Sequence, residues 1–129
     1  MMMLYIGRAF RLPLLLLLTL AAPIHAQPEA SAEQKIIAFA QDTMGNDWRR
    51  AQVRQFQEGI NGTRGIKFLY SDAGGDTAKQ IRNIEDHLYS GVDILVTSPQ
   101  NSALMTPVIQ SAYRSGTPVI LLSRTIVSE

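Results

Sequence analysis

The chain has 129 residues, of which 46% are hydrophobic and 18% charged, and its formal net charge is +1. This length and composition fit one ordinary globular domain and argue against general disorder. The chain has no cysteine, which excludes a disulfide scaffold, a thiolate zinc site, an iron–sulfur cluster and a lipid anchor on cysteine.

Residues 1–26 have the three-part layout of a cleaved export signal. Arg8 and Arg11 make the start positive, residues 12–22 form an apolar run, and Ala26 is a small residue before a polar segment. The run is too short to cross a bilayer, which takes about 20 apolar residues. We therefore expect an exported protein with no stable membrane insertion after cleavage. A membrane anchor or a buried core helix is the alternative.

Removing this signal changes the charge balance. Residues 27–129 contain ten basic and eleven acidic side chains, a net charge of −1. A nearly neutral exported chain lacks the electrostatic footprint of nucleic-acid binding, so no nucleic-acid partner is expected. Residues 27–34 are predicted to be a short polar linker, and residues 35–129 the folded domain.

Strands and helices are predicted to alternate along this domain. Short apolar runs typical of buried parallel strands occur at 35–40, 65–71, 92–97 and 118–122. Helical periodicity occurs at 47–60, from 77 to a stop at Gly91, and at 101–115. Pro107 fits the third helix only if that helix begins near Thr106 or is distorted in its first turn.

This alternation predicts an α/β fold, an open parallel sheet with helices on both faces and flavodoxin-like strand order 2-1-3-4. In such sheets ligands bind outside the carboxyl ends of the strands. The loops to question are therefore 41–48, 72–76, 98–102 and 123–125.

The first of these loops is chemically the most informative. Trp48 begins a predicted helix beside Gln41, Asn46 and Arg49. The apolar C–H face of a sugar ring can lie on an indole while amide and guanidinium groups bind its hydroxyls. Packing of Trp48 under the sheet edge is the alternative. Arg124, after the fourth strand, can donate two hydrogen bonds to a ligand.

No pattern for catalysis, metal binding or a cofactor is found. The chain lacks the Gly-x-Ser-x-Gly and His-Glu-x-x-His motifs, and the loop 72–76 lacks a complete phosphate-binding fingerprint. His87 is predicted to be a solvated or half-packed helix residue. Residues 61–63 match a glycosylation sequon but are interpreted as a turn.

Several segments occur in an order that resembles the N-terminal lobe of type I periplasmic sugar-binding proteins, the ribose- and galactofuranose-binding group related to LacI-type regulators. The segments are Phe39–Gln41, Gly45–Arg49, Asp76 with Lys79–Ile81, Gly91–Leu95 with Ser98–Pro99, and Gly116–Ile120 with Ser123–Arg124. The resemblance extends from Ile37 to Arg124. It implies half of a periplasmic-binding-protein-like fold.

The resemblance also implies a receptor without enzymatic activity or cofactor that delivers a small carbohydrate to an ABC permease or a membrane sensor. Trp48 would stack on the sugar, and Asn46 and Arg49 would contact it. Arg124 would match the arginine of an Asp-Arg pair, in which Ser123 replaces the aspartate. Because such receptors close two lobes on the ligand, residues 35–129 are expected to be a truncated, first-lobe part of one.

Three other functions stay open from the sequence. The main alternative is a periplasmic ligand-sensing input module for a histidine kinase or chemoreceptor. The effector domain of a transcription regulator is disfavoured by the export signal and by the lack of an N-terminal helix-turn-helix. An enzyme on a flavodoxin-like scaffold has no residues to recommend it.

Overall fold

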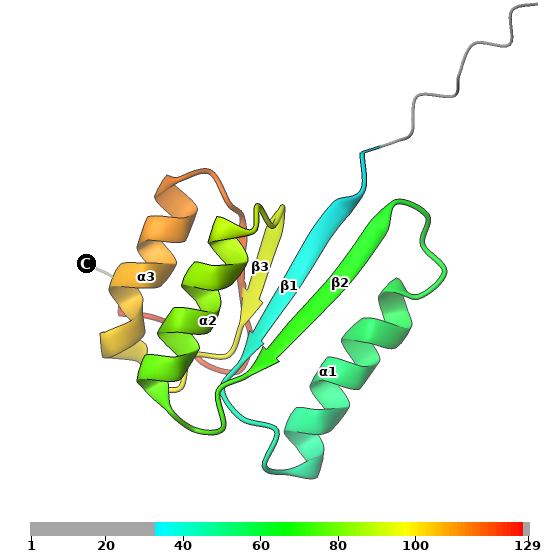
Figure 1. The fold of residues 1–129 in the computed structure, drawn as a ribbon. Helices are drawn as coiled ribbons and strands as arrows, with labels where there is room; N and C mark the ends of the chain where they lie inside the picture. Colours follow the sequence, from blue (N-terminus) through cyan, green and yellow to red (C-terminus); the bar gives the residue numbers. More distant parts are fainter. Residues whose placement is uncertain (1–32, 128–129) are drawn as a thin grey trace, which may run out of the picture. The chain divides into compact units, whose positions relative to one another are not determined.

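The computed structural model describes residues 33–127, so the predicted export signal and most of the predicted linker lie outside the described residues. The elements are β1 (Lys35–Gln41), α1 (Asp47–Ile60), β2 (Ile66–Asp72), α2 (Thr77–Tyr89), β3 (Ile94–Thr97), α3 (Ser102–Arg114) and β4 (Val119–Leu121). All strands are parallel in the order β2-β1-β3-β4, which confirms the predicted α/β fold and strand order (Figure 1).

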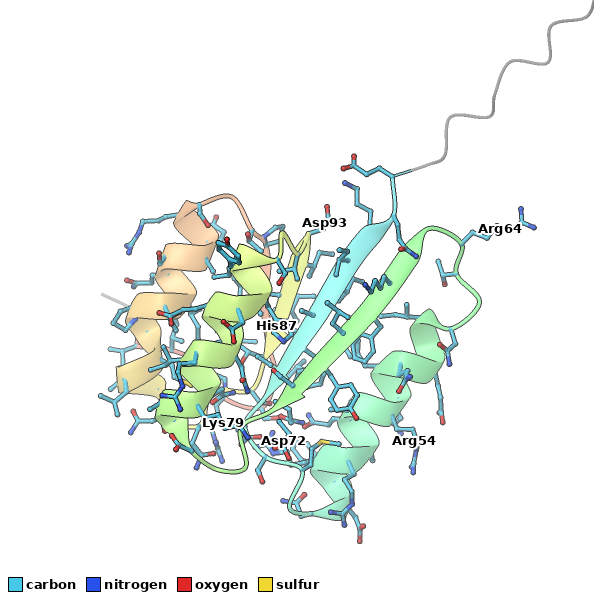
Figure 2. All side chains as sticks on the ribbon, viewed as in Figure 1. Arg54, Arg64, Asp72, Lys79, His87 and Asp93 are labelled. Carbon is cyan, nitrogen blue, oxygen red and sulfur yellow. The ribbon has the colours of Figure 1, made fainter. Side chains whose placement is uncertain are left out.

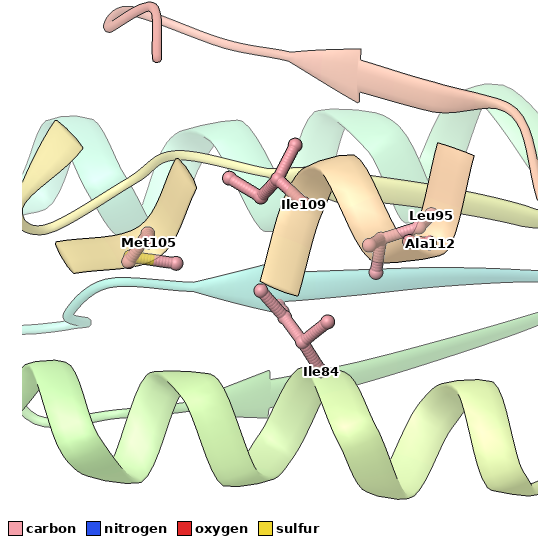
Figure 3. Packing of buried hydrophobic residues seen from close by; sticks show 6 residues of the cluster. Ile84, Leu95, Met105, Ile109 and Ala112 are labelled. Carbon is pink, nitrogen blue, oxygen red and sulfur yellow. The ribbon is translucent and has the colours of Figure 1, made fainter. Parts of the chain in front are cut away.

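The sheet has a hydrophobic core on each face. Figure 1 shows α1 on one face and α2 and α3 on the other. Successive side chains of a strand point to opposite faces, so Phe39 and Ala40 of the central strand β1 enter different cores. The larger cluster lies beneath α2 and α3, where Ile84, Leu95 and Met105 are fully buried (Figure 3).

Side-chain caps begin all three helices at the carboxyl ends of the strands. The side-chain oxygens of Asn46, Asp76 and Asn101 each accept a hydrogen bond from the backbone N–H three residues later, at 2.9, 3.0 and 3.0 Å. Such caps satisfy N–H groups that have no partner inside the helix. They also define where the first turn of each helix lies relative to the sheet edge.

Two local predictions differ from the structure. β3 begins at Ile94 rather than at residue 92, because Val92 N–H bonds the His87 carbonyl at 3.4 Å and closes the C-terminus of α2 around left-handed Gly91. Of the two ways in which Pro107 was expected to fit the third helix, a start near Thr106 does not occur. α3 already begins at Ser102 and contains Pro107, which has no N–H to donate to the carbonyl of exposed Ala103.

Candidate functional site

The carboxyl edge of the sheet gathers the predicted site residues. In the ladder, Gln41 at the end of β1 lies opposite Asp72, and Thr97 at the end of β3 lies opposite Leu121 of β4. The loops that follow these strands therefore emerge side by side. Figure 2 shows Asp72 at this edge.

Asn46 and the first turn of α1 position the aromatic and cationic groups. The side-chain oxygen Oδ1 of Asn46 accepts the Arg49 N–H, so Trp48 and Arg49 are held in the first turn. Trp48 is 56% exposed, and the Arg49 guanidinium carbon lies 4.8 Å from its ring centroid. This cation–π contact orients the indole while much of it stays open to solvent. The alternative in which Trp48 packs under the sheet edge does not occur.

Arg49 itself is nearly buried and anchored by its guanidinium. Its Nη1 donates to Ser98 Oγ at 2.9 Å and to Gln52 Oε1 at 3.2 Å, and Nη2 lies 3.0 Å from Asp42 Oδ2. A contact of 3.5 Å reaches Ser123 Oγ. Arg49 thus joins α1 to the ends of β1, β3 and β4.

Asp42, which the sequence analysis did not single out, lies at the centre of this edge. Its side chain is only 1% exposed. Oδ2 is 3.0 Å from Arg49 Nη2 and 3.2 Å from Arg124 Nη1, and Oδ1 accepts the Thr43 N–H at 2.9 Å. The replacement of an aspartate by Ser123 therefore does not leave Arg124 without an anionic partner. The sequence signal that could have identified Asp42 is its position as an acidic residue directly after a buried strand.

Arg124 is held by Asp42 but remains partly exposed to solvent. Its Nη1 also donates to the Pro99 carbonyl at 2.9 Å and approaches the Gln100 carbonyl at 3.4 Å, yet its side chain is 44% exposed. The preceding Ser123 has φ +67°, and the Arg124 N–H bonds the Leu122 carbonyl at 2.7 Å. This is a strained γ-turn, a conformation that concentrates at ligand-binding positions.

Gln41 and Gln80 brace the loops from inside. Gln41 is fully buried and donates to the Arg49 carbonyl and to Gln52 Oε1, each at 3.3 Å. A direct ligand contact by Gln41 would require this side chain to become exposed. Gln80 of α2 donates to the carbonyls of Ala40 and Ser98 at 3.1 and 2.8 Å. Sequence reasoning missed the role of Gln80, because a polar residue on a helix is ordinarily solvated.

His87 lies apart from this edge, toward the C-terminal end of α2 (Figure 2). Its Nε2 is 3.0 Å from Ser71 Oγ, and partial burial lowers the pKa of the imidazole.

Residues 33–127 contain no cluster of three or more His, Asp or Glu side chains that could hold a metal ion. Over the same residues, no helix is long and apolar enough to cross a membrane.

The chain is similar in sequence to known sugar-binding proteins. The ribose import binding protein RbsB of Bacillus subtilis is 29% identical over 109 residues, which cover 83% of this chain and 35% of the relative. The D-xylose-binding periplasmic protein of Haemophilus influenzae is 34% identical over 62 residues, 48% of this chain and 19% of the relative.

Solved structures agree on the fold. The fructose-binding periplasmic domain of hybrid two-component system BT1754 is 32% identical with a TM-score of 0.70, over 74% of this chain and 31% of that one. A galactofuranose-binding protein is 25% identical with a TM-score of 0.64, over 74% and 32% of the two chains. The present chain spans about a third of the length of RbsB and of these two structures. Residues 37–129 match the family described as periplasmic binding protein domain, and the chain therefore belongs to that family of binding proteins.

Proposed function

We propose that this chain contributes the first lobe of an exported receptor that captures a small carbohydrate and delivers it to an ABC permease. The observation that carries the proposal is that an exposed indole, Trp48, and a half-exposed guanidinium, Arg124, both lie at the carboxyl edge of the sheet. The relatives named for ribose and D-xylose support a sugar as the ligand.

The chemistry of this edge suits a sugar ring. The indole of Trp48 offers an apolar surface to the C–H groups of the ring, and Arg124 donates hydrogen bonds to its oxygens. Asn46 is exposed beside them and keeps its amide nitrogen for a hydroxyl. Because Arg49 and Asp42 already hold the loops together, little ordering is required when a ligand arrives, which favours affinity.

The proposal includes export to the periplasm. Family membership supports a location outside the cytoplasm, and the composition of residues 1–26 supports cleavage near Gln27. Mass spectrometry of the protein from the cell envelope tests this step. We expect an N-terminus near Gln27, whereas an intact Met1 terminus on envelope-located protein would contradict cleavage.

A ligand-sensing input module is the second candidate. It is favoured by the likeness to a fructose-binding domain that belongs to a hybrid two-component system. Deleting the gene separates the two roles. Loss of sugar uptake with normal gene induction supports delivery to a permease, whereas loss of sugar-dependent induction with normal uptake supports sensing.

Binding is tested directly with the fluorescence of Trp48, which is the single tryptophan of the chain. Titration with a panel of pentoses and hexoses is expected to change its emission. Because a hydrogen bond to a charged group contributes about 1.5–3 kcal/mol, Arg124→Ala should weaken binding about tenfold to a hundredfold. The matched control is Arg54→Ala on α1, because Arg54 is exposed and its nearest carboxylate is Glu58 at 3.8 Å.

Sugar binding by Trp48→Ala, which has no tryptophan fluorescence, is measured by calorimetry. Trp48→Ala should weaken binding comparably, while Tyr113→Ala, another exposed aromatic residue at the far end of α3, should not. If Trp48→Ala and Arg124→Ala bind the sugar as tightly as the parent, the carboxyl edge is not the binding site.

A further inference from the structure

The three charged side chains that meet at Asp42 do not balance one another. One carboxylate oxygen, Asp42 Oδ2, is the anionic partner of both Arg49 and Arg124, at 3.0 and 3.2 Å. Each guanidinium group carries one positive charge. The linked group of three side chains therefore carries a net charge of +1 when Asp42 is ionised.

The excess charge resides on Arg124. Arg49 is nearly buried, and its two terminal nitrogens are engaged by Asp42, Ser98 and Gln52. By contrast, only Nη1 of Arg124 has acceptors among residues 33–127, and the side chain is 44% exposed. Nη2 and Nε of Arg124 are thus available to a ligand.

The other acidic groups of this edge do not compensate Arg124. Asp47 forms its ion pair with Arg50 at 2.7 Å, and Asp76 caps α2. Asp72 Oδ1 accepts the backbone N–H groups of Met44 and Gly74, at 3.1 and 2.8 Å. Within the described residues, no carboxylate other than that of Asp42 lies within 4.0 Å of the Arg124 guanidinium.

We propose that the ligand is a sugar acid whose carboxylate pairs with Arg124, an inference that rests on the proposed sugar-binding function. A planar guanidinium with two free donor groups matches the two oxygens of a carboxylate. The neutral hydroxyl of Ser123, at the position next to it, adds no repulsion to an incoming anion. Trp48 receives the apolar face of the same sugar.

Asp42 positions Arg124 without occupying the donors that face solvent. Its carboxylate is 1% exposed and turned to the two arginines, so it does not compete with a ligand for solvent-facing donors. It holds Nη1 of Arg124 in place and leaves the remainder of the guanidinium free. A carboxylate on the ligand would balance the positive charge that Asp42, Arg49 and Arg124 together carry.

The test compares matched pairs of ligands that differ only in the carboxylate: galacturonate with galactose, and glucuronate with glucose. Binding is measured with the full chain by Trp48 fluorescence and calorimetry at millimolar ligand and at two salt concentrations. We expect the acid of one pair to bind at least about tenfold more tightly, which corresponds to about 1.4 kcal/mol. Added salt should reduce this preference, because ions screen a partly exposed charge pair.

Variants and probe anions complete the test. Arg124→Gln should abolish the preference for the acid, while the matched control Arg54→Gln should keep it. Acetate and inorganic phosphate should bind far more weakly than the uronate.

Three results would overturn the inference. Equal or tighter binding of the neutral sugar overturns it and leaves the proposed function standing. Binding of acetate or phosphate as tight as that of the uronate replaces the sugar acid by a general anion. Absence of binding by all four sugars overturns the inference, and it overturns the proposed function as well if the panel of pentoses and hexoses also fails to bind.

Discussion

Asp42→Asn removes the carboxylate on which the carboxyl edge depends. The substitution preserves the shape of the side chain but leaves the nearly buried guanidinium of Arg49 without a negative partner. It also removes the charge partner of Arg124, which is 82 residues away in the chain. We expect the loops after β1 and β4 to lose their connection and the domain to lose stability.

The magnitude follows from burial. Removing one member of a buried ion pair costs about 3–5 kcal/mol, whereas exposed pairs contribute about 0–1 kcal/mol. Asparagine keeps a carbonyl acceptor for Arg49, and the contact with Arg124 is half exposed, so we expect about 3 kcal/mol. For a domain near this size, each kcal/mol shifts Tm by about 4–8 °C, which predicts a fall of about 12–24 °C.

Urea unfolding and thermal melting of the processed chain measure this loss. The matched control is Asp47→Asn in the same loop region, because Asp47 is fully exposed and pairs with exposed Arg50. Its free energy of unfolding should stay close to that of the parent. Adding Arg49→Met to Asp42→Asn should recover part of the loss, because it removes the unpaired buried charge. Equal stability of Asp42→Asn and Asp47→Asn would refute the reasoning.

Three further predictions concern other parts of the domain. Partial burial lowers the pKa of His87 below its usual 6.5, so the unfolded chain binds a proton before the folded chain does. The stability of the parent should therefore fall as the pH drops below about 6.5, and more steeply than that of His87→Gln in denaturant titrations across this range; parallel slopes would contradict this. Ser123→Gly should be more stable than Ser123→Ala by about 0.5–1 kcal/mol, because both variants lose the hydroxyl that accepts from Gln52 Nε2, while only glycine avoids about 1–2 kcal/mol of left-handed backbone strain, at a cost in chain entropy. Ser123→Ala keeps the strain and loses the hydroxyl, so a more stable Ala variant would exclude this explanation. Ile120 is 43% exposed on the edge strand β4, and Ile120→Lys should reduce self-association in sedimentation experiments. Gln57→Lys on the exposed face of α1 is the control, and a parent chain that stays monomeric at high concentration would contradict the prediction.

The sequence alone predicts the arrangement of elements well. Continuous apolar runs mark β1 as a strand buried on both faces, and the alternation with helices allows one handedness of crossover. The strand order 2-1-3-4 is that of flavodoxin-like sheets, in which the first crossover runs one way and the later ones the other, and it is confirmed. These features depend on local composition and general chain geometry, which a sequence contains in full.

Local boundaries were less predictable where two local interactions compete. Val92 has the composition of a strand residue, yet its N–H completes the C-terminus of α2. Pro107 disfavours a helix interior, yet α3 continues through it because Met105, Ile109 and Ala112 bury their side chains in the core. Packing against the sheet outweighs the single hydrogen bond that proline removes.

Some candidate binding residues could be predicted from the sequence, whereas the contacts between them could not. Trp48 and Arg124 could be selected from the sequence because their chemistry is unusual for loops that follow strands. The connection between them could not be selected, since Asp42 and Arg124 are 82 residues apart and Gln80 and Ala40 are 40 apart. Which buried carboxylate holds which guanidinium, and whether an amide such as Gln41 faces solvent or the interior, depends on distances of a few ångströms between separate elements. Only the tertiary structure decides those distances, because they arise when the strands pair and the helices pack onto the sheet.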